Sequence, residues 1–197
     1  MNKIIFVILC VFFLFLVSCG DDLPLDKDLT KKSYDLINQD GEDVIFPEDI
    51  LGHITVMGFI YTHCPDICPM TTHNMYLTEK KLKELGLTKI KFVALSFDPE
   101  RDSPEVLTKF AEVRELDFKS WTLLTGNEPI INDLMRRFDV KAIKTDETVD
   151  DEGNPEYSMM HTDRISLIDS NGRLRKNYKG STLNIEELVT DIKKLED

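Results

Sequence analysis

The stretch ITVMGFIYTHCPDICP, residues 54–69, decides the fold. Its first half, residues 54–61, is an almost unbroken apolar run rich in β-branched side chains, as in a strand buried on both faces of a sheet. Beyond two cysteines, residues 70–85 repeat apolar side chains at helical spacing and stop at Gly86. Because Pro69 has no main-chain N–H to donate, we expect the regular helix to begin there.

The same alternation of strand and helix continues toward the C-terminus. Strands are expected at 90–97 and 121–124, and helices at 103–116, 128–138 and 184–195. Turn residues at 38–41 and 169–172 each separate two short apolar runs, which predicts an N-terminal hairpin and a late hairpin. The sequence therefore predicts an α/β fold in one domain, residues 33–197, with a central mixed β-sheet flanked by helices plus these two hairpins.

The N-terminus is typical of an exported lipoprotein. The apolar run from Ile4 to Val17 has 14 residues, whereas a membrane-spanning helix needs about 20. It ends in LVSCG, residues 16–20, which is similar to a bacterial lipobox. We therefore predict a signal peptide at 1–18, a lipid on Cys19 and a tether over 19–32; the alternative is an uncleaved anchor. Both interpretations place the domain outside the cytoplasmic membrane and attached to it.

The charge balance excludes one class of partner. Thirty-six acidic side chains against 24 basic ones give a net charge of -12, so a nucleic acid is not expected as a ligand. Acidic side chains concentrate at 146–156, just before Met159 and Met160. A solvated loop is the simpler interpretation of this segment, and a docking surface for a basic partner is the alternative.

Only two of the four cysteines remain for the folded domain. Cys10 lies in the predicted signal peptide and Cys19 carries the lipid, which leaves Cys64 and Cys68. One close pair constrains the unfolded chain very little, so a structural disulfide is the weakest of three interpretations. The others are thiol–disulfide exchange and ligation of copper, for which thiolates are soft donors. A helix N-terminus beside the pair predicts a lowered thiol pKa.

A copper site would need a further ligand, and the chain has four histidines. His53 begins the buried strand and is expected to be structural, while His73 is expected on an exposed helix surface. His63 adjoins Cys64 and cannot easily point into the same site. His161 is expected to open the strand at 164–168, where its loop could lie beside the cysteine pair.

Four segments resemble the Sco/SenC family of copper proteins involved in cytochrome oxidase assembly. They are GFIYTHCPDICP (58–69), FVALSFDPERDSPE (92–105), WTLLTG (121–126) and HTDRISLIDSNG (161–172). They occur in the family's order and spacing, and the similarity covers roughly residues 33–195. The resemblance implies a thioredoxin-like fold and one copper ion per chain, as Cu(I) or Cu(II), bound through Cys64, Cys68 and His161.

The resemblance also implies a function. The protein would be a metallochaperone that delivers copper to the dinuclear copper site of a cytochrome c oxidase subunit, or prepares that site by reducing its cysteines. The alternative is a membrane-tethered thiol-disulfide oxidoreductase acting through Cys64 and Cys68 on this or another cuproprotein. Thioredoxins themselves use Cys-x2-Cys and a cis-proline where this chain has His161-Thr162. A monomer is expected, and whether it is an enzyme stays open.

Asp98 is a further candidate near the copper. It follows the strand at 90–97, and the loops after parallel strands converge on one edge of a sheet, where Cys64 is also expected. Its carboxylate either caps the following turn or supports the site from behind the ligands.

Overall fold

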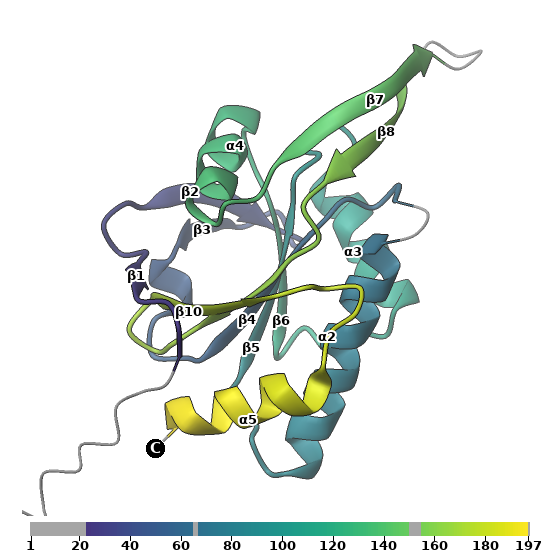
Figure 1. Ribbon diagram of the computed structural model, residues 1–197. Coiled ribbons are helices and arrows are strands. Elements are labelled where there is room, and N and C mark those ends of the chain that lie inside the picture. Colours follow the sequence, from purple (N-terminus) through teal and green to yellow (C-terminus); the bar gives the residue numbers. More distant parts are fainter. Residues whose placement is uncertain (1–22, 65–66, 150–154, 197) are drawn as a thin grey trace, which may run out of the picture.

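An eight-stranded mixed sheet forms the centre of the protein (Figure 1). The structure is a computed structural model and describes residues 23–64, 67–149 and 155–196. The strand order is β1-β10-β9-β4-β5-β6-β2-β3; β4, β5 and β6 run parallel, and the other neighbours are antiparallel. The strands are β1 (Lys27–Asp28), β2 (Tyr34–Asn38), β3 (Asp43–Phe46), β4 (Thr55–Ile60), β5 (Lys91–Ser96), β6 (Trp121–Thr125), β9 (Ile165–Ile168) and β10 (Arg173–Tyr178).

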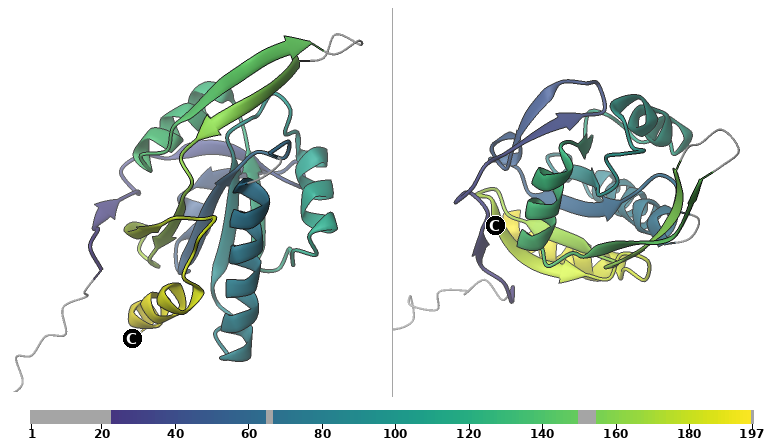
Figure 2. Two further views of the ribbon diagram at one scale, coloured as in Figure 1. Left: turned by 45° about the vertical axis from the view of Figure 1, so that its right-hand side comes forward. Right: turned by 90° about the horizontal axis from the view of Figure 1, so that it is seen from above.

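Helices cover both faces of this sheet. They are α2 (Ile67–Glu84), α3 (Pro104–Val113), α4 (Glu128–Arg137) and α5 (Ile185–Glu196), with a short 3-10 helix η1 at Glu48–Ile50. Figure 2 shows α2 and α3 on one side of the central strands and α4 on the other. Gly58 permits the close approach of α2, because a Cβ there would lie 2.5 Å from Met75 Sδ. Phe59 points the other way, toward Phe138 at the end of α4. The predicted mixed α/β fold with its two hairpins is confirmed.

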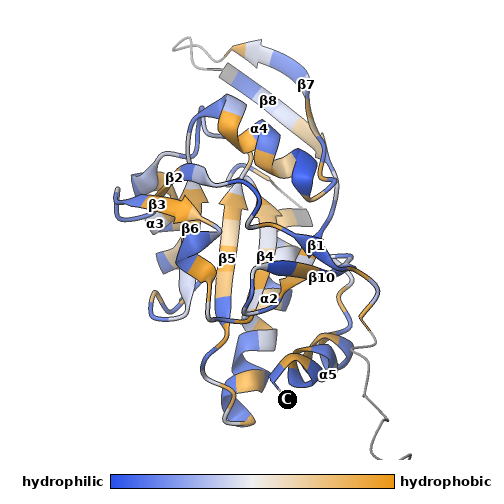
Figure 3. Cartoon of the chain, turned by 90° about the vertical axis from the view of Figure 1, so that its left-hand side faces the viewer, coloured by the Kyte–Doolittle hydropathy of each residue, from blue (hydrophilic) through white to orange (hydrophobic). Residues whose placement is uncertain are grey.

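The core lies around the parallel strands. All six residues of β4 are buried, as the apolar run in the sequence predicts. The rings of Phe92 on β5 and Trp121 on β6 stack with their centroids 5.2 Å apart. In Figure 3 the hydrophobic colour runs along most of β5, while the outer faces of the surrounding elements are largely hydrophilic. Cys64 and Cys68 therefore follow the end of a fully buried strand.

The described residues of the acidic segment, 146–149 and 155–156, do not lie in the loop that the composition predicts. They belong to a separate two-stranded sheet, β7 (Ala142–Val149) and β8 (Pro155–His161), which projects from the body of the protein (Figure 1). Main-chain pairing, such as that of Thr148 with Glu156, holds these residues in strands despite the charge of the segment. As a result His161 closes β8, whereas the sequence predicts that it opens the following strand.

Two helix boundaries also differ from prediction. Helix α2 begins at Ile67, two residues before Pro69, because a proline fits the first turn of a helix where its missing N–H has no partner to bond. Helix α3 ends at Val113 instead of 116, since Glu115 adopts a left-handed backbone conformation with φ of 55° that a helix cannot contain. The first difference places Cys68 inside the helix.

The N-terminal residues that the structure describes belong to the domain. Leu23 and Leu29 are buried, and β1 pairs with β10 at the edge of the sheet. Residues 23–32, which the sequence predicts to be part of a tether over 19–32, therefore pack against the body. The predicted signal peptide at 1–18 and Cys19 lie outside the described residues. Within the described part of the chain, no helix combines the length and the apolar character needed to cross a bilayer.

Candidate metal centre

The two cysteines lie where β4 passes into α2. Cys64 follows the end of β4 and is half-buried, while Cys68 lies in the first turn of α2 and is fully buried. The main-chain N–H of Cys68 donates to Cys64 Sγ at 3.3 Å, which fixes the first sulfur over the start of the helix. Both are thiols without a disulfide between them. Cys64 is thus the member of the pair that can be reached from solvent.

The third candidate, His161, comes to this pair from the end of β8. Its Nε2 lies 3.6 Å from Cys68 Sγ, and its Nδ1 lies 3.2 Å from the main-chain oxygen of Thr162. A carbonyl only accepts hydrogen bonds, so Nδ1 carries the proton and Nε2 presents its lone pair to the sulfurs. The rings of Phe97 and Tyr61 pack against the imidazole, with centroids 4.9 and 5.9 Å away.

The ligand atoms of Cys64, Cys68 and His161 all lie within 4.8 Å of one another. Among the described residues this is the one group of histidine, cysteine and acidic side chains that could hold a metal ion. Two sulfurs and one imidazole nitrogen form a soft to borderline donor set, which fits copper and disfavours hard cations such as Mg²⁺. The structure thus brings together the three residues that the resemblance implies.

The other histidines are directed elsewhere. His63 is exposed, and its Nδ1 lies 3.1 Å from Thr62 Oγ1. His73 is exposed on α2 and stacks on Tyr76. His53 lies before β4, with its Nδ1 3.4 Å from the main-chain oxygen of Lys89. These positions agree with what the sequence predicts for all three.

Protonation of the thiols differs from the sequence prediction. The hydrogen bond with Cys64 and burial together raise the pKa of Cys68, whereas the helix N-terminus predicts a lowered one. The prediction is wrong for Cys68 because the neighbouring sulfur and the loss of water outweigh the lowering effect of the backbone hydrogen bond with Tyr61. Burial alone would lower the pKa of His161, but hydrogen bonds with Cys64 and the Thr162 carbonyl raise it. A metal ion must therefore displace a proton from Cys68.

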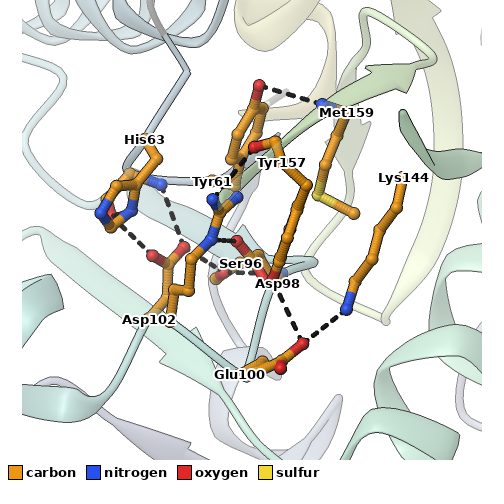
Figure 4. A network of polar contacts seen from close by, with 11 residues as sticks. Tyr61, His63, Ser96, Asp98, Glu100, Asp102, Lys144, Tyr157 and Met159 are labelled. Carbon is orange, nitrogen blue, oxygen red and sulfur yellow. Dashed lines mark hydrogen bonds and ion pairs between the residues drawn. The ribbon is translucent and has the colours of Figure 1, made fainter. Parts of the chain in front are cut away.

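A buried carboxylate holds the segment that leads to Cys64. Asp102 is fully buried and accepts hydrogen bonds from Thr62 N at 3.0 Å, Thr62 Oγ1 at 2.5 Å and Ser96 Oγ at 2.5 Å (Figure 4). Burial raises the pKa of its carboxyl. Sequence reasoning missed this role, although Asp102 ends the DPERD stretch and directly precedes Ser103, the cap of α3.

Asp98 lies at the predicted edge of the sheet, just past β5, and is buried. The turn that follows is capped by the main-chain oxygen of Asp98, which accepts from Arg101 N and Asp102 N. Its carboxylate instead accepts from Arg101 Nε at 2.6 Å and from the Tyr157 hydroxyl at 2.5 Å. Figure 4 shows this carboxylate between the DPERD turn and β8. It is thus placed to act on His161 through β8 rather than by direct contact.

Comparison with known proteins gives this geometry a context. The sequence matches the SCO1/SenC family over residues 24–197, which is nearly the whole chain. Three solved structures are similar in fold and sequence, and all have a thioredoxin-like fold.

Two of these structures bear on location and metal. A SCO1/SenC family lipoprotein from Bacillus anthracis has a TM-score of 0.74 and 29% identity, covering 89% of this chain and 98% of the other. ScoI of Bradyrhizobium japonicum, solved with copper bound, has a TM-score of 0.70 and 27% identity, covering 83% and 98%.

The third bears on redox chemistry. It is BsSco, a member of the Sco family of cytochrome c oxidase assembly proteins in which a disulfide switch has been identified. Its TM-score is 0.71 and its identity 28%, covering 88% of this chain and 95% of that one.

Proposed function

Since the chain belongs to the SCO1/SenC family, we propose that it binds one copper ion and delivers it to, or prepares by thiol reduction, the dinuclear copper site of cytochrome c oxidase. The observation that carries the proposal is the convergence of Cys64, Cys68 and His161, whose ligand atoms lie within 4.8 Å of one another. The copper bound to ScoI and the disulfide switch of BsSco support it. The partner is the copper-site subunit of the oxidase or another cuproprotein.

In this site the two thiolates bind Cu(I), and the imidazole of His161 adds a borderline donor that also suits Cu(II). The main-chain oxygen of Thr162 orients the imidazole, and the Phe97 and Tyr61 rings shield it from water. Cys64 is the partly exposed ligand, so exchange of the metal with a partner begins at its sulfur.

The decisive experiment titrates Cu(I) and Cu(II) separately into the reduced protein while counting thiols. One equivalent of stable copper that protects two thiols supports the metallochaperone. A dithiol that binds neither ion above the level of a Cys64→Ser, Cys68→Ser double variant would rule out copper as its cargo.

Thiol–disulfide exchange is the second candidate function. It is favoured by the difference in exposure between the two cysteines, since Cys64 is half-buried and Cys68 is buried. A reductase needs one accessible thiol to attack the partner's disulfide, and half-buried Cys64 supplies it. The buried thiol of Cys68 then attacks Cys64 and releases the partner, leaving a Cys64–Cys68 disulfide. The partner's disulfide gains two electrons and two protons, and a thiol donor must reduce this protein again. Cys68 must lose its proton in this step, which its raised pKa slows.

Replacing His161 by alanine should separate the two oxidation states of copper. Because two thiolates remain, Cu(I) should stay bound. Cu(II) should bind more than about a hundredfold more weakly, since losing the imidazole itself costs more affinity than the roughly 10–100-fold lost with a group that only supports a ligand. The thiolate-to-copper absorption of the Cu(II) form should shift as well. His73→Ala is the matched control, because His73 is exposed on α2. An unchanged Cu(II) spectrum in the His161 variant would exclude His161 as a ligand.

We also propose that Cys19 is the mature N-terminus and carries lipid, which places the protein on the outer face of a membrane. The 14-residue apolar run ending in LVSC supports this, as does the similarity to the B. anthracis lipoprotein. Mass spectrometry of the membrane-extracted protein should find a chain that begins at Cys19 and carries the mass of its acyl groups. Detection of intact residues 1–18 would contradict the proposal, and Cys10→Ser should leave processing unchanged.

A further inference from the structure

One turn of the chain contacts both segments that bear the ligand candidates. We call residues 98–102 the anchor turn; it follows β5 and precedes α3. At its end, Asp102 accepts both hydrogen bonds from Thr62, two residues before Cys64. At its start, Asp98 and Arg101 contact Tyr157 on β8, four residues before His161. Figure 4 shows both sets of contacts meeting at this turn.

The contact with Tyr157 involves its hydroxyl, its ring and its main chain. The hydroxyl donates to Asp98 Oδ1 at 2.5 Å, and Arg101 Nη1 donates to the Tyr157 main-chain oxygen at 3.0 Å. The guanidinium carbon of Arg101 lies 3.5 Å from the centroid of the Tyr157 ring. The Asp98 and Arg101 side chains are 1% and 12% exposed, so these contacts are largely shielded from water and salt.

Strand β8 needs such contacts because, among the residues that the structure describes, no main-chain pairing joins it to the central sheet. In that part of the chain it pairs with β7 alone, in a two-stranded sheet of their own. Other polar links from the described residues of the β7–β8 sheet to the body are longer or more exposed: Met159 N to the Tyr61 hydroxyl at 3.4 Å, the Tyr157 hydroxyl to Glu100 Oε2 at 3.3 Å, and Lys144 of β7 to half-exposed Glu100. His161 is therefore held by side-chain contacts, those of β8 with the body and those of its own ring with Phe97 and Tyr61, rather than by main-chain pairing of β8 with β4.

We propose that Arg101 and Tyr157 are positioning residues: together with Asp98 they hold β8 on the anchor turn, and this keeps the His161 imidazole at bonding distance from the thiols. Because Asp102 of the same turn holds the segment before Cys64, the turn sets the separation between the cysteine and histidine parts of the site. The inference rests on the proposed copper function only for the Cu(II) measurement below, and the hydrogen-exchange measurement is independent of that function.

Tyr157→Phe is the most informative variant. It removes the hydroxyl, with its bond to Asp98 and its longer contact with Glu100, and keeps the ring, its stacking on Arg101 and the Asp98–Arg101 ion pair. Asp98→Asn is less informative, since it would leave the buried guanidinium without its counter-charge. Arg101→Lys is the second variant, because a lysine keeps the charge but cannot reproduce the planar stacking and the bond to the Tyr157 oxygen together.

The first measurement needs no metal. In the full-length, detergent-solubilised, reduced protein, amide hydrogen exchange over residues 156–162 should become roughly tenfold faster in Tyr157→Phe, the factor for losing one hydrogen bond to a charged group. Exchange in α5 should not change. Tyr178→Phe is the matched control, because the Tyr178 hydroxyl donates to Asp191 at 2.9 Å in a similar tyrosine–carboxylate pair on β10 and α5.

The second measurement uses Cu(II). Tyr157→Phe should weaken Cu(II) binding roughly tenfold, as loss of a group that supports a ligand does. It should have no further effect in a His161→Ala background, because the residue acts through His161. Equal effects in both backgrounds, or unchanged exchange over 156–162 in both Tyr157→Phe and Arg101→Lys, would overturn the proposal. If the unaltered protein binds no copper, the proposed function fails and hydrogen exchange still decides this inference.

Discussion

Replacing Cys68 by serine is expected to abolish stable copper binding. Cys68 is fully buried, its Sγ lies 3.6 Å from His161 Nε2, and a serine hydroxyl at this place is a hard donor that keeps its proton. One thiolate and one imidazole would remain. Loss of a group that only supports a metal ligand lowers metal affinity roughly 10–100-fold. We therefore expect loss of the ligand itself to lower the affinity for Cu(I) by more than about a hundredfold. Competition with a chromophoric Cu(I) chelator measures this directly.

The matched control is His73→Ala, which changes an exposed side chain on α2 and should leave affinity unaltered. Thermal unfolding of the metal-free Cys68→Ser protein should show a folded domain, because serine is close in volume to cysteine. If that folded variant retained Cu(I) within about threefold of the unaltered protein (well under the tenfold that 1.4 kcal/mol represents), Cys68 would not be a ligand. Cys64→Ser should give the same loss as Cys68→Ser.

Oxidation of the pair should be as damaging to copper binding as removal of a sulfur. A Cys64–Cys68 disulfide forms as two thiols release two electrons and two protons, and its sulfurs carry no thiolate for the metal. The sulfurs are close enough to join after a small movement, since both lie within the 4.8 Å group. Protein oxidised with one equivalent of diamide and then desalted should bind no copper. Dithiothreitol, removed before titration, should restore one equivalent.

A protein that bound Cu(I) as tightly after oxidation as before would contradict this coupling. Thiols are counted before each titration: a count of zero shows that the pair is oxidised, and a count of two shows that it is reduced. Diamide should leave copper binding unchanged when the dithiol has first been loaded with Cu(I), because the metal then occupies both sulfurs.

The central part of the fold could be predicted because its signals are local. The apolar run at 54–61 corresponds to β4, and Ser103-Pro104 marks the start of α3 as a cap followed by a first-turn proline. The β7–β8 hairpin could not be predicted in this way. No residue of β7 is buried, and exposed Met160 breaks the apolar alternation of β8, so no clear period-2 pattern distinguishes the pair from a charged loop.

The ligand residues of the site could be predicted. The pKa of Cys68 and the contacts that hold the ligand-bearing segments in place could not. Cys64 and Cys68 are close together in the sequence, and the resemblance supplied His161. The raised pKa of Cys68 comes first from the hydrogen bond with Cys64 and then from burial by distant parts of the chain, and the sequence spacing alone fixes neither the geometry of that bond nor the burial. The contacts of Asp102 and Tyr157 span 40 and 59 positions along the chain, so they too arise only from the tertiary structure.

The packing of Leu23 and β1 against the sheet has a consequence for where this protein can work. With lipid on Cys19, only four residue steps separate the acyl chains from Leu23, a reach of at most about 14 Å. So short a tether keeps the domain close to the bilayer surface. Donor and acceptor molecules must then meet at nearly equal heights on one membrane, so the rate of exchange should follow their surface density and lateral diffusion rather than their concentration in the surrounding fluid.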